Sequence, residues 1–249
     1  MLLLLVLLAA PDTHELRYRF EKGMSYDETT TRSFDFASGE GKEKQRLASS
    51  SIETLRRTVL ETDETNHPTI ERIEVLRFSQ PVISSRPDDP GTVADPSEGK
   101  TFVWRRLEER WGLFDGKSDV TERHPRLVER LKNWRDARLP KAPVAVGATW
   151  EVSARTYLET AGLPVPSEIE GVSVHKLERV EGEVATISFR FVARAVLDGA
   201  AQEWDQTGTI RFDLARGRDL EWTAEGSVKV AGKEGGEGTF KMSRKVTYR

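Results

Sequence analysis

Most of this chain alternates between apolar and polar residues, which is the period of a β-strand with one buried face. Near the start, Leu16, Tyr18 and Phe20 alternate with charged residues, and the longest run places apolar side chains at every second position from Ala185 to Leu197. Further strands are expected over 24–36, 44–61, 70–79, 101–114, 149–160, 171–180 and along the C-terminal segment. Since short turns separate these runs, the pattern predicts an antiparallel meander.

One segment has instead the 3.6-residue period of an amphipathic helix. Leu127, Leu131 and Trp134 form an apolar stripe among Arg, Lys and Glu residues, Pro125 suits a first helical turn, and Pro140 ends the segment. We therefore expect one main helix over about 122–139, covering one face of the sheet. The segment 44–61 is better described as a strand, although its apolar spacing also fits a helix.

These elements predict a mainly β fold (α+β), a long antiparallel meander that forms a curved sheet or half-barrel packed on the helix at about 122–139. We expect a single β-rich domain over 15–249. An alternative organisation has two pseudo-repeats, 15–120 and 140–249, joined by the helix at 121–139. It rests on Gly23 and Gly147, which lie 124 residues apart, each with an aromatic residue three positions later. Both glycines are expected at turns with positive φ.

The run Leu2–Ala10 is apolar throughout and does not alternate. It is too short to span a bilayer, which takes about 20 residues, but it matches the apolar part of a signal peptide, roughly 7–15 residues long. No basic residue precedes it, and a buried N-terminal strand or helical turn is the alternative. We expect a signal peptide at 1–14 and export to the periplasm or the extracellular space. The complete absence of Cys suits an exported protein that folds without disulfides.

Two motifs resemble a family of exported bacterial proteins of unknown function. The segment 139–150, LPKAPVAVGATW, resembles that family's LP-x-x-PV-x-VG-x-x-W motif, and the segment 16–23, LRYRFEKG, resembles its opening L-x-Y-x-F-x-x-G. The resemblance implies a fold similar to the bacterial lipoprotein carriers (LolA-like), with a curved antiparallel sheet that closes round a helix. It implies no catalytic residue, and a likeness of fold alone says little about function.

Catalytic and metal-binding motifs are missing from the sequence. No zinc-protease, nucleophile-elbow or phosphate-loop motif occurs, and the segment 171–175, GVSVH, lacks the second Gly of a nucleophile elbow. None of the histidines has a partner at metal-ligand spacing; they are His14, His67, His124 and His175. We therefore expect no cofactor, no metal and no enzyme activity.

The alternative is a hydrolase with a carboxylate pair in the Pro-rich loop at 81–99. The acidic residues of that loop considered for such a pair, or for weak cation binding, are Asp88, Asp89, Asp95 and Glu98.

Partner classes follow from charge and from the large aromatic residues. With 38 basic and 41 acidic residues the net charge is −3, so no broad basic surface attracts nucleic acid. The aromatic residues expected to line a ligand cleft or the core are Trp104, Trp134, Trp150, Phe189, Phe191, Trp204, Phe212 and Trp222. We hypothesise an exported, non-enzymatic β protein that binds an apolar small molecule or an envelope protein in the concavity of its sheet. A purely structural or protein-interaction module of the cell envelope is the alternative.

Overall fold

A computed structural model describes residues 12–39, 45–84, 92–93, 95–108, 110–131, 135–161, 165–197, 199–232 and 235–249. The apolar run Leu2–Ala10 lies outside these ranges, so the signal peptide stays a prediction. Within them, neither helix has the length and apolar character needed to cross a bilayer.

The chain is dominated by strands. They are β1 Thr13–His14, β2 Ser25–Ser38, β3 Gln45–Thr62, β4 Pro68–Ser84, β5 Thr92–Val93, β6 Thr101–Arg106, β7 Trp111–Asp115, β8 Ser118–Asp119, β9 Val144–Ala145, β10 Thr149–Ser153, β11 Glu168–Glu181, β12 Val184–Leu197, β13 Ala200–Asp213, β14 Arg218–Val230 and β15 Gly236–Tyr248. The α-helices are α1 Pro125–Leu131 and α2 Ala154–Ala161, and short 3-10 turns occupy Thr121–Arg123 and Arg135–Arg138.

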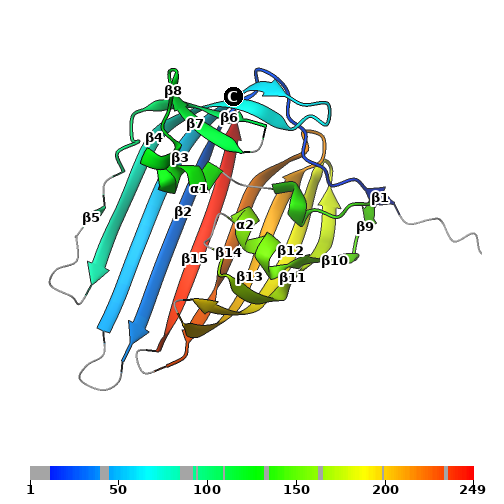
Figure 1. Cartoon of the computed structure of the whole chain (residues 1–249). Helices are drawn as coiled ribbons and strands as arrows, with labels where there is room; N and C mark the ends of the chain where they lie inside the picture. The colour runs from blue at the N-terminus through cyan, green and yellow to red at the C-terminus, as the bar shows by residue number, and fades with distance from the viewer. Residues whose placement is uncertain are drawn as a thin grey trace, which may run out of the picture.

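Nearly all the strands belong to one antiparallel sheet. Its order is β10-β11-β12-β13-β14-β15-β2-β3-β4-β6-β7-β8, β5 adds to β4, and β1 pairs with β9 in a separate two-stranded sheet. Strands that follow one another in sequence are therefore neighbours, except where red β15 lies beside blue β2 (Figure 1). This confirms the predicted mainly β meander. The sheet is open, because its edge strands β10 and β8 do not pair.

Two glycine turns introduce equivalent strands in the two halves of the sheet. Gly23 (φ 87°) precedes β2 and Gly147 (φ 88°) precedes β10, in the left-handed region predicted for both. The Gly23 N–H donates to the Val59 carbonyl at 2.8 Å, and the Gly147 N–H donates to the Leu177 carbonyl at 2.7 Å. The sheet thus consists of two six-strand meanders, β2 to β8 without β5 and β10 to β15, that meet where β15 pairs with β2.

Helix α1 lies inside the predicted helical segment but is shorter. Its α-helical part is Pro125–Leu131, residues 135–138 form a 3-10 turn, and Trp134 lies outside the described residues. Helix α2 is a correction, since the segment 149–160 was expected to be a strand throughout. The strand pattern stops at Ser153, whose Oγ accepts a hydrogen bond from the Thr156 N–H at 3.2 Å and caps the helix.

Both helices pack against the same face of the sheet, here called the inner face (Figure 1). Around α1, Leu127, Val128 and Leu131 pack on a core that contains Ile73 and Phe102. Around α2, a larger core takes in the inner face of β10 to β14. The space between the helices and the sheet is therefore filled with side chains over most of the inner face.

Both sequence motifs contribute to the larger core. Leu16, Tyr18 and Phe20 of the opening motif are buried in it, as is Leu139, and Trp150 packs against it. The Trp150 Nε1–H donates to the Arg138 carbonyl at 2.9 Å. These motif residues therefore have a structural role in holding the chain segments against the sheet.

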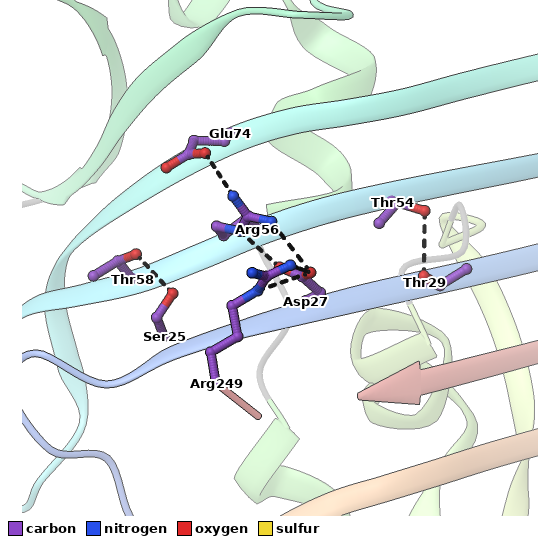
Figure 2. A network of polar contacts seen from close by, with 8 residues as sticks. All are labelled: Ser25, Asp27, Thr29, Thr54, Arg56, Thr58, Glu74 and Arg249. Carbon is purple, nitrogen blue, oxygen red and sulfur yellow. Dashed lines mark hydrogen bonds and ion pairs between the residues drawn. The ribbon is translucent and has the colours of Figure 1, made fainter. Parts of the chain in front are cut away.

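The opposite, outer face is polar. Figure 2 shows its upper end, where Arg56 of β3 donates to Asp27 at 2.9 Å and to Glu74 at 3.4 Å, and Arg249 donates to Asp27 at 2.6 Å. Cross-strand hydroxyl pairs flank this network, such as Thr29 with Thr54 at 3.2 Å. The outer face of the sheet thus carries charges and hydroxyls that pair along it.

Candidate ligand site on the inner face

Among the residues that the structure describes, an apolar region of the inner face lies outside the two helix-covered cores. It consists of Phe34 and Phe36 of β2, Phe240 of β15 and Trp204 of β13, all of them partly buried, and is called the aromatic strip below. Phe34 and Phe36 stack with ring centroids 5.9 Å apart, Phe34 is the cross-strand partner of Phe240, and the rings of Phe240 and Trp204 lie 5.9 Å apart. The strip crosses four neighbouring strands, a width of roughly 14 Å at the usual strand spacing.

Glycines in the same face let these rings approach one another. On the intervening strand β14, Gly226 is the partner of Phe240 and Val228 is the partner of Trp204, so the two rings meet diagonally across that strand. At Gly238, a Cβ atom would stand 2.8 Å from the Phe36 ring and 3.3 Å from the Phe34 ring. Phe34 and Phe36 therefore lie against the bare backbone of Gly238, while Val228 stands beside Trp204.

A hollow of about 270 Å³ adjoins this strip. It is called the arginine hollow, and its lining residues are Arg32, Ser33, Phe34, Ser49, Ser51, Phe78, Gln80, Arg126 and Arg130. Arg126 and Arg130 lie one turn apart on α1, on the side that its apolar residues leave free. Phe34 belongs to both the strip and the hollow, so the two form one continuous site.

Arg32 is the cation of this hollow with the weakest protein contacts. Its Nε donates to the Met242 Sδ at 3.1 Å, and among the described residues no carboxylate lies within ion-pair distance of it. Burial lowers the pKa of the Arg32 guanidinium, against the opposing charges of Glu53 and Glu28. An arginine still remains protonated at neutral pH, so a buried positive charge with a thioether partner faces the hollow.

Arg130, by contrast, is held by two carboxylates. Its Nε lies 2.7 Å from Glu53 Oε1, and its Nη2 donates to Asp95 Oδ2 at 2.9 Å. Its guanidinium also lies over the Phe78 ring, 5.2 Å from the centroid. Burial raises the pKa of Glu53 to about 7, because desolvation outweighs the attraction of Arg130 and Arg32. Around the hollow, Asp95 and the partly protonated Glu53 contact Arg130, and Glu53 and Glu28 attract Arg32 from beyond ion-pair distance.

A second, larger hollow lies on the outer face and has different chemistry. It measures about 850 Å³ and spans β13 to β4 across the sheet. Its hydroxyls bond one another, as between Thr31 and Ser243 at 2.6 Å, and Lys241 pairs with Glu225 at 3.3 Å. These polar groups therefore already have partners within the chain, and the apolar part of the lining includes Ile52 and Pro81.

Most of the predicted aromatic residues lie in the cores. Trp104 packs near α1, Trp204 belongs to the aromatic strip, and Trp134 is outside the described residues. The others lie in or against the core around α2: Trp150, Phe189, Phe191, Phe212 and Trp222.

Ser173 and His175 form a hydrogen bond of 3.0 Å between Oγ and Nε2 on the inner face of β11. Both side chains are fully buried, and His175 Nδ1 has no hydrogen-bond partner among the described atoms. Burial, with the charge of Arg138, lowers the pKa of His175 to about 3. The pair therefore lacks the solvent access and the orienting carboxylate of a nucleophile–base arrangement.

Of the four acidic residues considered in the loop, Asp95 and Glu98 belong to the described part of the chain, and Glu98 is exposed. Asp88 and Asp89 lie outside the described residues, and Asp95 is bound to Arg130. Within the described ranges, no three His, Asp or Glu side chains gather as metal ligands.

The site residues that the sequence does not predict are Phe34, Phe36, Phe240 and the three arginines of the hollow. Phe34 and Phe36 sit in a strand rich in Thr, Ser and charge, where two aromatics on one face are a local signal. The placement of Arg126 and Arg130 opposite Arg32 depends on tertiary structure, and no local pattern indicates it.

The fold is similar to part of a much larger protein. Lipovitellin, in a solved structure of lipid–protein interactions, aligns over 93% of this chain with a TM-score of 0.54 and 9% identity. The chain covers 25% of that lipovitellin chain. An outer membrane channel from Pseudomonas putida F1 aligns over 96% of this chain and 100% of its own, with 7% identity and a TM-score of 0.31, too low to carry an argument. No protein-family model and no curated protein matches the sequence.

Proposed function

We propose that this chain is an exported, non-enzymatic β protein that binds an apolar or amphipathic small molecule along the aromatic strip. The observation that carries the proposal is the strip itself: four large aromatic residues stay partly exposed near one another on the inner face, and the exposed Leu47 is the cross-strand partner of Phe36. Ligand sites of this kind are lined by aromatic groups with a few polar groups that fix the orientation. The arginine hollow supplies those polar groups.

Two further observations support the proposal. The outer face pairs many of its charges and hydroxyls, and the exposed apolar side chains there include the valines Val174, Val192 and Val196, which offer no ring to a ligand. The fold is similar to that of lipovitellin, which was solved for its interactions with lipid. A ligand would lie at the end of the inner face, because the two cores occupy the rest of the concavity.

The absence of catalysis and the export are parts of the same proposal. Ser173 and His175 are fully buried, and Asp95 is occupied by Arg130, so neither offers a reactive group at the ligand surface. Export rests on the apolar run Leu2–Ala10. Fractionation of a producing cell is the measurement that checks it, and accumulation of unprocessed chain in the cytoplasm would contradict it.

A neutral dye tests the binding directly. Nile red fluorescence, displaced by a neutral long-chain alcohol, measures occupancy of an apolar surface without charge effects. The double variant Phe34→Ala/Phe240→Ala should weaken dye binding at least tenfold, about 1.4 kcal/mol. The matched control is Phe114→Ala, which removes a partly buried ring on β7 at the far edge of the sheet. Equal binding by the double variant and the wild-type chain would overturn the proposal.

A further inference from the structure

We infer that the arginine hollow binds the anionic headgroup of an amphiphile whose apolar chain lies on the aromatic strip. The inference rests on the proposed function and adds the chemical class of the ligand: a molecule with one carboxylate or phosphate group and a long apolar chain. Arg32, Arg126 and Phe34 are the residues that join the two parts of the site.

Charge is the first argument. Arg126 is exposed and makes no ion pair among the described residues, and Arg32 has only the Met242 sulfur as a hydrogen-bond partner there. Two guanidinium groups with unused donors face one hollow. Guanidinium groups bind carboxylate and phosphate oxygens through paired, charge-assisted hydrogen bonds.

Among the described residues, no carboxylate lies within ion-pair distance of either arginine, and Glu53 and Glu28 attract Arg32 only from further away. Glu53 and Asp95 both contact Arg130, and Glu28 lies 3.4 Å from Arg244 Nε. The positive charge that remains in the hollow is that of Arg32 and Arg126, and an anion from outside the chain complements it.

Size and position give the second argument. At about 270 Å³ the hollow is slightly below the usual range of about 300–1,000 Å³ for sites that enclose a whole small molecule. It therefore fits a headgroup, while the chain of the amphiphile needs a surface next to it. The aromatic strip begins at Phe34, in the wall of the hollow, and continues across β15 to β13.

The test compares two ligands with the same apolar chain. Oleate and oleyl alcohol are titrated against bound Nile red at low ionic strength, below the concentration at which oleate forms micelles. We expect oleate to bind about tenfold more tightly than oleyl alcohol, the effect of one charge-assisted hydrogen-bonding group. Acetate and inorganic phosphate, which lack the chain, should not displace the dye.

Two variants locate the effect. Arg126→Gln should remove most of the preference for oleate and leave the affinity for oleyl alcohol unchanged, and since Arg126 is exposed the fold is kept. Arg123→Gln is the matched control, because this exposed arginine lies just before α1 and does not line the hollow.

The outcomes separate the two proposals. Two results would overturn the headgroup site but not the binding on the aromatic strip. One is equal affinity of the wild-type chain for oleate and oleyl alcohol. The other is an equal loss of the preference for oleate in Arg126→Gln and Arg123→Gln. If neither ligand displaces the dye or the dye does not bind, the proposed function itself is wrong.

Discussion

Glu53 makes the stability of this protein depend on pH in a direction opposite to that of most carboxylates. Its side chain is buried beside Arg130, and its pKa of about 7 lies above the usual 4.5. Between these two values the folded chain binds a proton that the unfolded chain has released. The contribution of Glu53 to stability is therefore fully present below pH 4.5 and is lost as the pH rises toward and past 7.

The size of this effect follows from the two pKa values. Compared with a group that stays protonated, the titration of Glu53 lowers the free energy of unfolding by about 1 kcal/mol at pH 5 and by about 3 kcal/mol at pH 8. Glu53→Gln keeps the shape of the side chain and removes its titration. We therefore expect the stability of this variant, relative to the wild-type chain, to increase by about 2–3 kcal/mol between pH 5 and pH 8.

Urea unfolding of both proteins at the two pH values measures this change. Taking the difference between the proteins cancels the other titrating groups. Glu225→Gln, which removes an exposed carboxylate on the outer face, is the control for the change in net charge. The contrary outcome is that the free energies of unfolding of Glu53→Gln and the wild-type chain differ by the same amount at pH 5 and pH 8, within about 0.5 kcal/mol. That result would show that the pKa of Glu53 is not raised by folding.

Two further predictions concern buried polar groups. Asp219→Asn should lower the free energy of unfolding in urea by about 3–5 kcal/mol, because Asp219 accepts hydrogen bonds from the buried Arg138 and from Tyr18. Asp205→Asn, in an exposed pair with Arg190, should change it by less than about 1 kcal/mol. Similar losses in both variants would refute the claim that burial makes the Asp219 pair the more important one. His175 should stay neutral across pH 5–8, because burial holds its pKa at about 3; NMR of its ring carbons checks this, and a titration near pH 6.5 would show that the ring is hydrated.

The sequence predicts this fold well where the alternation is uninterrupted. In β12 the expected inward residues from Ala185 to Ala195, such as Ile187, Phe189 and Phe191, are all buried, because a strand with one buried face must alternate. Prediction is weaker where polar residues face inward. In β3 the apolar Ile52 points to the outer face while Glu53 points to the inner one, since Leu55 fixes the direction of that face. No count of hydrophobic residues finds such a position.

The helix that the sequence did not predict shows the same limit. The segment 149–160 begins as a strand, with Trp150 and Val152 facing inward, and so the alternation favours a strand for all of it. After Ser153 the buried residues are Ala154, Tyr157 and Leu158, which have helical spacing. A switch of period within a dozen residues leaves too few positions to identify either element.

The candidate ligand surface depends on the glycines of the inner face as much as on its aromatic residues. Gly208, Gly226 and Gly238 lie on the adjacent strands β13, β14 and β15. Gly226 is two positions from Ala224, the partner of Gly208, and Gly238 is two positions from Phe240, the partner of Gly226. A Cβ atom at Gly208 would stand 2.7 Å from Phe189 Cε1, and one at Gly238 would meet Phe36. In the sequence these glycines look like gaps in an apolar face, because Gly weakens a strand. In the sheet, Gly238 lets Phe34 and Phe36 of the strip lie against the backbone beside the arginine hollow, and Gly208 does the same for Phe189 of the core.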